Sequence, residues 1–120
     1  MARFRYMVED AAAAADFYTE NFGFEVQLKV PAICIVTKDD MTLLLSGPRS
    51  SARREMPDGT KPVPGGWNRI MFEVEDIESE VARLKEAGVK FRNPIISGPG
   101  GQQSIAEDLD GNAIEVFQPD

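Results

Sequence analysis

The sequence predicts an α+β protein made of two tandem βαβββ units, and three observations support that fold class. The tripeptide Val-Glu-Asp stands at positions 8–10 and again, 66 positions later, at 74–76. A strand-like run precedes each copy, and a helix-like run that ends near a glycine follows it. Each half then closes with a turn and a strand that runs into a proline. A duplicated unit of one strand, one helix and three strands accounts for all three observations.

Local patterns place the elements of each copy in order. The first copy has its strand at 3–8, its helix at 11–21, an extended stretch at 24–30 and its closing turn and strand at 39–48; the second has them at 69–74, 77–87, 89–92 and 110–119. A glycine, Gly23 or Gly88, follows each helix, and glycine readily adopts the left-handed conformation that ends a helix. A glycine cluster at 98–101 predicts a hairpin turn and not a phosphate-binding loop, because no strand-to-helix pattern surrounds it.

Length and charge bound the class of protein. The 120 residues are expected to form a single domain, with repeat 1 at about 1–48, a linker at about 49–65 and repeat 2 at about 66–120. Thirteen basic and twenty acidic residues give a net charge of −7, which repels nucleic acid and anionic lipid. That charge could favour a cationic ligand or could serve solubility alone. No apolar run approaches the ~20 residues of a membrane span. The expected partner is therefore a small molecule, with neither nucleic acid nor membrane involved.

Scarce residue types narrow the chemistry further. The chain has no histidine, which is the commonest general base and metal ligand. The single cysteine, Cys34, excludes an internal disulfide and stands in an apolar strand, so we expect a buried structural thiol. The first residues lack the apolar stretch of a secretory signal, and a cytoplasmic location is expected.

Strand parity predicts which side chains cover the helices. In each strand, alternate apolar side chains are expected to cover the helix, and the opposite set to line a concave cup that the two sheets form together. The predicted helix side comprises Phe4, Tyr6, Val8, Leu43, Leu45, Ile70, Phe72, Val74, Ile114 and Val116. The predicted cup side comprises Arg3, Arg5, Met7, Leu44, Arg69, Met71, Glu73, Ala113, Glu115 and Phe117. A register error of one residue would exchange the two sets.

The repeated segments resemble the vicinal oxygen chelate superfamily. The resemblance rests on the two Val-Glu-Asp copies, Asn-Phe-Gly-Phe at 21–24, Ala-Gly at 87–88 and, most specifically, Asp-Leu-Asp-Gly-Asn-Ala-Ile-Glu-Val-Phe-Gln-Pro at 108–119. The superfamily contains glyoxalase I, extradiol dioxygenases, fosfomycin-resistance transferases and bleomycin-binding proteins. The resemblance covers nearly the whole chain and implies a glyoxalase-like fold with a cup-shaped mixed sheet, commonly as a homodimer. A shared fold does not by itself carry an activity.

The resemblance also implies where a divalent metal would sit. Enzymes of the superfamily hold it with one residue near the start of each unit's first strand, usually histidine, and one in each last strand, usually glutamate, histidine or glutamine. The matching residues here are Arg3, Leu44, Arg69 and Glu115. Only Glu115 could be a ligand, whereas a divalent ion needs three or more donors, so neither a metal nor another cofactor is expected. The two arginines could instead brace Glu115, or bind a carboxylate or phosphate of a ligand.

Ten residues form the candidate ligand-binding set. They are Arg3, Arg5, Leu44, Trp67, Arg69, Met71, Glu73, Gln103, Glu115 and Phe117. Trp67, the only tryptophan, follows two glycines and could stack on a planar ligand; alternatively, it could lie in the core or at a dimer interface. The long segment 47–66 could form a flap over the cup or a solvated connector.

Three functions stay open at this point. The first, which the missing metal ligands favour, is a metal-free small-molecule-binding protein of the glyoxalase/bleomycin-resistance type, with its ligand in the concave sheet or at a dimer interface. The second is a lyase, isomerase or dioxygenase-like enzyme with a non-standard or absent metal site, in which Glu115 or Glu73 would be the general base. The third is a structural or regulatory domain whose cup is filled by its own side chains. The sequence identifies neither the ligand nor a catalytic residue.

Overall fold

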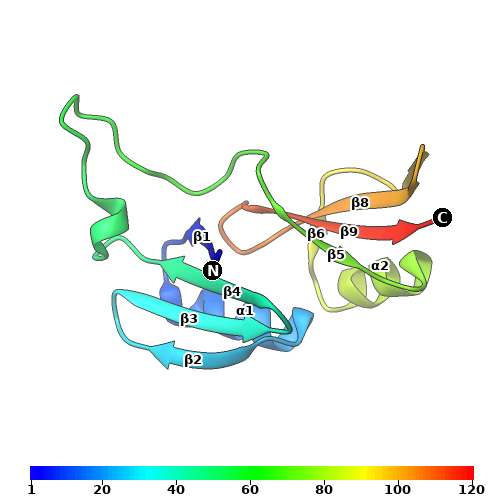
Figure 1. The fold of residues 1–120 in the computed structure, drawn as a ribbon, viewed down its shortest axis with the longest axis horizontal. Helices are drawn as coiled ribbons and strands as arrows, with labels where there is room; N and C mark the ends of the chain where they lie inside the picture. Colours follow the sequence, from blue (N-terminus) through cyan, green and yellow to red (C-terminus); the bar gives the residue numbers. More distant parts are fainter. The chain divides into compact units, whose positions relative to one another are not determined.

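The computed structural model describes all 120 residues, which fold into two compact units, unit 1 (Met1–Gly65) and unit 2 (Gly66–Asp120). Each unit holds one α-helix against a mixed sheet (Figure 1). This is the α+β, glyoxalase-like arrangement of βαβββ units that the sequence predicts. Neither α-helix has the length and apolar character needed to cross a bilayer.

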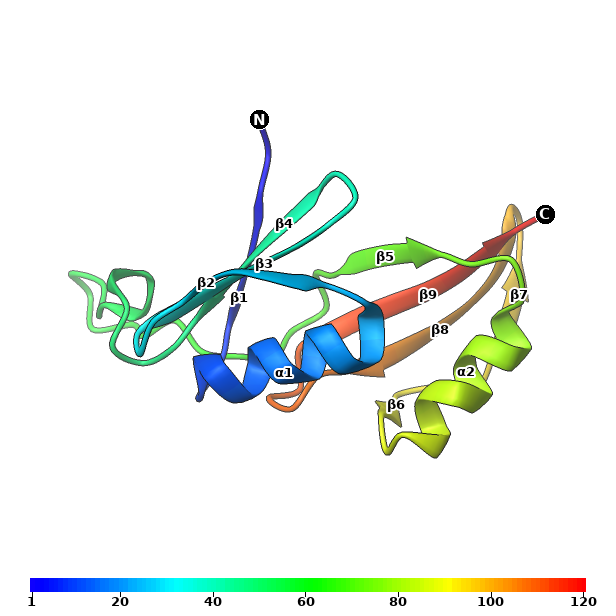
Figure 2. The same cartoon turned by 90° about the horizontal axis from the view of Figure 1, so that it is seen from below.

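Unit 1 is a four-stranded sheet with a helix on one face. It contains β1 (Phe4–Met7), α1 (Ala11–Phe22), β2 (Glu25–Lys29), β3 (Ile33–Lys38), β4 (Met41–Ser46) and the short 3-10 helix η1 (Ser51–Arg53). The strand order is β1-β4-β3-β2, with β1 parallel to β4 and the other neighbours antiparallel. Figure 2 shows α1 running along one face of this sheet.

The ends of α1 follow from the residues placed there. Asp10 is extended, and its carboxylate accepts a hydrogen bond from the Ala13 N–H at 3.1 Å, which satisfies a donor that has no partner inside the helix. Gly23 closes the helix with a φ of 73°, as expected for a left-handed C-cap. In the last turns Tyr18 is fully buried and stacks on Tyr6 of β1, with ring centres 6.0 Å apart. The face of β1 that carries Tyr6 therefore covers the helix.

Unit 2 repeats the plan with a divided edge strand. It contains β5 (Ile70–Glu73), α2 (Ile77–Glu86), β6 (Lys90–Phe91), β7 (Ile96–Gly98), β8 (Gly101–Glu107) and β9 (Ala113–Pro119). The strand order is β5-β9-β8-β6, and β7 also pairs with β8. Asp76 caps α2 as Asp10 caps α1, with its carboxylate 3.2 Å from the Ser79 nitrogen. The glycine-rich turn at 98–101 joins β7 to β8 as a hairpin, as the sequence predicts.

The division into β6 and β7 departs from the predicted repeat of three strands after the helix. Pro94 lies between the two strands and has no N–H to donate to a ladder. Next to it, the Asn93 side chain replaces a backbone partner: its Oδ1 accepts a hydrogen bond from the Ile105 N–H at 2.8 Å. The Ser104 hydroxyl donates to the Asn93 carbonyl at 2.9 Å. The repeat is therefore altered only at the edge of the sheet.

The two units share one strand register. Arg5 lies opposite Leu44 in unit 1, and Met71 lies opposite Glu115 in unit 2. Arg5 and Met71 are 66 positions apart, which is the offset of the sequence repeat. Leu44 and Glu115 are therefore equivalent positions, as the sequence predicts.

The apolar side chains that strand parity assigns to the helix side of β4 and β9 are fully buried. Leu43, Leu45, Ile114 and Val116 are all 1% exposed or less, on the helix side. We call the opposite side of each sheet its helix-free face. In unit 1 this face carries Arg3, Arg5, Met7, Leu44 and Ser46. In unit 2 it carries Arg69, Met71, Glu73, Arg92, Gln103, Ile105, Glu107, Ala113, Glu115 and Phe117.

The segment that follows β4 is anchored to unit 1 by one arginine. Arg53 of η1 donates to the Val8 carbonyl at 2.6 Å and to the Pro62 carbonyl at 2.9 Å, and pairs with Glu9 at 3.2 Å. Its side chain is only 9% exposed. These contacts argue against a freely moving flap between η1 and Pro62.

Replacing Arg53 by methionine should release this segment. We expect the Glu55–Met56 bond to be cut about tenfold faster by a glutamate-specific protease, because cleavage follows the population of locally open chain. The matched control is Arg54→Met, because the neighbouring Arg54 side chain is exposed. Equal cleavage rates in the two variants would show that Arg53 is not the anchor.

Candidate functional site

Arg69 and Glu115 form a partly buried ion pair on the helix-free face of unit 2. The Nε and Nη2 atoms of Arg69 lie 2.9 and 2.8 Å from Oε1 of Glu115. The side chains of Arg69 and Glu115 are 26% and 10% exposed. The pair forms because Arg69 directly precedes β5, and β9, which carries Glu115, is the parallel neighbour of β5. The bracing of Glu115 that the sequence predicts is thus present for Arg69, whereas for Arg3 it stays a prediction.

Trp67 lies over the guanidinium group of Arg92. The Arg92 Cζ atom is 4.5 Å from the centre of the indole ring, within the range of a cation–π contact. Arg92 is itself held by Oε2 of Glu107 at 2.9 Å and by the Gly66 carbonyl at 2.9 Å. The Trp67 carbonyl accepts a hydrogen bond from Nη1 of Arg69 at 3.0 Å. Trp67 is nevertheless 67% exposed, so the alternative of a core residue is wrong.

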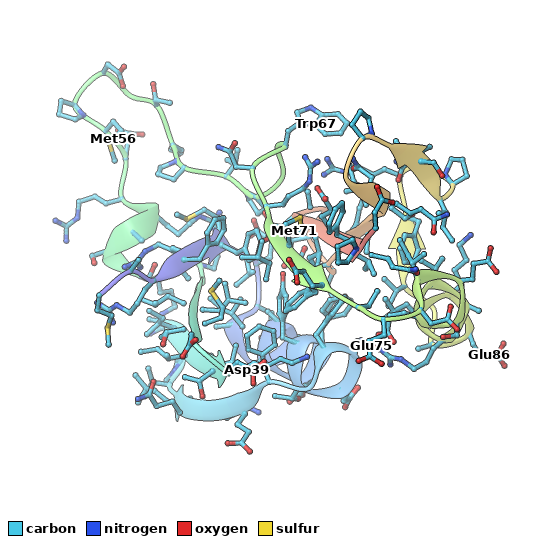
Figure 3. The ribbon with its side chains drawn as sticks, turned by 45° about the vertical axis from the view of Figure 1, so that its right-hand side comes forward. Asp39, Met56, Trp67, Met71, Glu75 and Glu86 are labelled. Carbon is cyan, nitrogen blue, oxygen red and sulfur yellow. The ribbon has the colours of Figure 1, made fainter.

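Apolar and polar candidates stand beside this pair on the same face. Figure 3 shows Trp67 at the start of the segment that leads into β5, and Met71 further along on β5. Met71 is 51% exposed, so its thioether can be reached from solvent. Glu73, Phe117 and Gln103 lie across three neighbouring strands, because Phe117 pairs with both of the others. The unit 2 candidates therefore share one surface.

Unit 1 contains a pocket beside β1 and β4, and three of its four lining residues belong to the helix-free face. Arg3, Phe4, Arg5 and Leu44 line an open pocket of about 260 Å³, in which Phe4 is the one residue that alternation assigns to the helix side. Nη1 of Arg5 donates to the buried hydroxyl of Ser46 at 2.8 Å. Arg3 has neither a hydrogen bond nor an ion pair within unit 1. The structure thus brings together three of the predicted site residues around an open space.

The residues at the positions where superfamily enzymes hold a metal do not suit one. Arg3 and Arg69 are permanent cations, Leu44 has no donor atom, and Glu115 is engaged by Arg69. Elsewhere in the chain, no three or more aspartate, glutamate or cysteine side chains gather in an arrangement that could hold a metal ion. This donor set disagrees with the three or more ligands that a divalent centre requires.

Two contributors to these sites lie outside the predicted set. Arg92 supports Trp67, and Ser46 orients Arg5. β6 contains only two residues, which is too short for alternation to assign a face to the arginine that follows it. Cys34, by contrast, fulfils its prediction: it is fully buried, and burial raises the pKa of its thiol. A protonated, enclosed thiol suits a structural role.

Comparisons with known proteins agree with this architecture. Residues 1–116 match the family model described as the Glyoxalase/Bleomycin resistance protein/Dioxygenase superfamily. The uncharacterized protein YurT of Bacillus subtilis (strain 168) is 34% identical over 119 residues, which cover 92% of each chain. The antibiotic binding protein TnmS3 from Streptomyces sp. CB03234 is 27% identical, with a TM-score of 0.69 over 100% of this chain and 97% of its own. Lactoylglutathione lyase from Agrobacterium tumefaciens has a TM-score of 0.76 at 22% identity, over 98% and 92% of the two chains, a likeness of fold alone.

Proposed function

The chain belongs to the Glyoxalase/Bleomycin resistance protein/Dioxygenase superfamily, and we propose that within it this protein binds a small molecule without a divalent metal. The observation that carries the proposal is the Arg69–Glu115 ion pair. It engages the one carboxylate among the four positions where superfamily enzymes carry metal ligands. TnmS3, which is similar at 27% identity over 97% of its length, is an antibiotic binding protein, and this supports a binding role over a catalytic one.

The helix-free face of unit 2 is the proposed surface for a planar part of the ligand. Trp67 offers a large exposed ring whose position is held by Arg92 and Arg69. Such anchoring lowers the entropy cost of stacking, because the ring is already ordered before the ligand arrives. The exposed side chain of Met71 adds an adaptable apolar contact on the same surface.

Neither candidate general base has surroundings that support catalysis. Glu115 is held by two guanidinium nitrogens, and a proton acceptor must instead be free to reach its substrate. Glu73 is exposed, so solvent surrounds the carboxylate. These surroundings favour a binding protein over a lyase, an isomerase or a dioxygenase-like enzyme.

Metal analysis of the purified full chain tests the metal-free part of the proposal. We expect elemental analysis to find no stoichiometric divalent ion after dialysis against buffer with added zinc, nickel or manganese. One bound ion per chain would overturn the proposal.

The single tryptophan provides a direct test of ligand stacking. A panel of planar aromatic compounds should include members that quench Trp67 fluorescence saturably, while saturated analogues of the same size should not. By calorimetry, Trp67→Ala should weaken binding of those members about tenfold, the factor that corresponds to ~1.4 kcal/mol of stacking. The control is Leu109→Ala, which removes another exposed apolar side chain, 63% exposed and outside this face. An unchanged affinity in Trp67→Ala would exclude stacking on this ring.

We also propose that the chain forms a homodimer. The proposal follows from the superfamily resemblance and from three apolar side chains of unit 1, Val26, Leu28 and Val30, which are 41–46% exposed on and next to the edge strand β2. Sedimentation equilibrium of the full chain should give twice the chain mass of 13.2 kDa. A single-chain mass across the micromolar range would contradict it.

A further inference from the structure

We propose that the pocket of unit 1 binds an oxyanion of a small molecule, a carboxylate or a phosphate, through Arg3 and Arg5. The inference rests on the proposed small-molecule-binding function and deepens it by naming the chemistry of one end of the ligand. It comes from the pocket lined by Arg3, Phe4, Arg5 and Leu44 and from a comparison of the two units.

The second unit shows what the first lacks. Arg3 and Arg69 stand at equivalent positions, each one residue before its first strand, and Leu44 and Glu115 are equivalent by strand register. In unit 2, Nη2 and Nε of Arg69 lie 2.8 and 2.9 Å from Oε1 of Glu115. In unit 1 the corresponding side chain is leucine, so the strand paired with β1 offers the arginine no carboxylate at this position. A carboxylate or phosphate carried by a ligand would supply the missing partner.

The two unit 1 arginines have donors to offer. Arg3 makes no hydrogen bond or ion pair in its unit, and Arg5 uses one nitrogen on the Ser46 hydroxyl. A guanidinium group has five N–H donors in a planar fork that matches the two oxygens of a carboxylate or phosphate. Because Ser46 is fully buried, its contact with Arg5 fixes the direction of that fork. One arginine is thus oriented in advance, and the other has no partner within its own unit.

The protein has a net negative charge, which opposes the binding of an anion, but that charge is unevenly divided between the two units. Unit 1 has eight basic and nine acidic residues, a net charge of −1, whereas unit 2 has five and eleven, a net charge of −6. Most of the net charge of −7, which could suggest a cationic ligand, therefore belongs to the other unit. Within unit 1, the two arginines that line the pocket are the charged groups nearest to a bound anion, so they contribute most to the attraction that it meets there.

The pocket is large enough to hold one end of a ligand. Its volume of about 260 Å³ is below the ~300 Å³ at which pockets for whole drug-sized ligands begin. Leu44 supplies an apolar contact beside the guanidinium groups. The fitting group is therefore an oxyanion attached to a ring or a short apolar chain.

Calorimetric titration of the full chain tests the assignment. The probes are benzoate, phenyl phosphate, inorganic phosphate and the neutral benzamide. We expect benzoate or phenyl phosphate to bind with an affinity that falls as salt is added, and benzamide not to bind. Tighter binding of benzoate identifies a carboxylate site, and tighter binding of phenyl phosphate identifies a phosphate site. Equal binding of benzoate and benzamide would overturn the proposal.

Charge-neutral variants locate the binding. Arg3→Gln and Arg5→Gln should each weaken the preferred anion about tenfold, the loss expected for one charge-assisted hydrogen bond of ~1.4 kcal/mol. Arg54→Gln is the matched control, because it removes the same charge from an exposed arginine outside the pocket. An equal loss in Arg54→Gln, or no loss in Arg3→Gln, would show that the anion binds elsewhere or not at all.

A variant that closes the pocket from within provides the sharpest test. Leu44→Glu places a carboxylate at the position that corresponds to Glu115, and we expect it to pair with Arg3 and abolish anion binding. Leu44→Gln has the same shape without the charge and should retain anion binding. Circular dichroism establishes that both variants are folded. Wild-type affinity in a folded Leu44→Glu variant would overturn the proposal.

The outcomes separate this inference from the proposed function. If planar compounds quench Trp67 while benzoate, phenyl phosphate and benzamide behave alike, the oxyanion site is wrong and the binding function stands. If metal analysis finds a stoichiometric divalent ion, the proposed metal-free function is wrong, whatever the anion titrations give.

Discussion

Replacing Glu115 by glutamine should lower the free energy of unfolding by roughly 1–3 kcal/mol. Glutamine keeps the shape of the side chain but removes the negative charge that lies 2.8 Å from Arg69. The guanidinium is then left partly buried without a counter-charge. Because the Arg69 side chain is 26% exposed, solvent screens part of that cost, and we place the loss below the largest values for fully buried pairs. Urea denaturation followed by circular dichroism measures it.

The matched control is Glu73→Gln on the same face of the sheet. Glu73 is exposed, so the same chemical change should alter stability by about 0.5 kcal/mol or less. If both variants shifted the midpoint equally, the effect would reflect overall charge and not the ion pair. An unchanged midpoint in Glu115→Gln would mean that the ion pair with Arg69 does not stabilise the folded chain.

Replacing Gly101 by alanine should destabilise unit 2 by about 3 kcal/mol. The residue has a φ of 154°, which side chains rarely adopt, and a Cβ atom there would overlap the Gln118 carbonyl oxygen. It would also lie 2.9 Å from Cζ of Phe117 and 3.0 Å from Cα of Pro119. Because two of these atoms are backbone, the strand must move to make room. The expected result is a lower thermal midpoint, together with weaker ligand binding where Phe117 is displaced.

Gly98 supplies the control within the same hairpin. It pairs with Gly101, but no atom lies within 4 Å of the place where its Cβ would be, and its φ lies outside the left-handed range. Gly98→Ala should therefore change stability by about 0.5 kcal/mol or less. Similar losses in both variants would indicate that the turn responds to any lost glycine and not to the overlap with β9.

The repeat and the strand faces could be predicted because both depend on short-range patterns. The Val-Glu-Asp copies mark equivalent strand ends, and alternation assigns Leu44 and Glu115 to the face away from the helix. The division of the edge strand could not be predicted in the same way. It depends on Asn93, whose side chain pairs with Ile105, twelve residues away. Such a substitution of side chain for backbone leaves no periodic signal.

In the candidate sites, too, the contacts that follow from the repeat could be predicted and the others could not. The Arg69–Glu115 pair follows from the offset of the repeat, so sequence reasoning reaches it. The support of Trp67 by Arg92 does not follow, because it depends on a contact across 25 positions between two irregular segments. Net charge describes the whole chain, so it does not indicate which charges line a particular pocket, such as Arg3 and Arg5 in unit 1.

The edge of the unit 2 sheet has a consequence for how such a protein diverges after duplication. Phe4 and its partner Leu43 are 39 positions apart, whereas Ile70 and Ile114 are 44 apart, although the helix of unit 2 is two residues shorter. The additional chain therefore lies between α2 and β9, where the divided edge strand is found. An edge strand pairs with only one other strand, so an insertion in it leaves the pairing of the remaining strands unchanged. After duplication, the edge segment of unit 2 could change in length without disturbing the rest of the sheet. Single substitutions in β4 and β9, such as Leu44 against Glu115, separately changed the chemistry of the helix-free face.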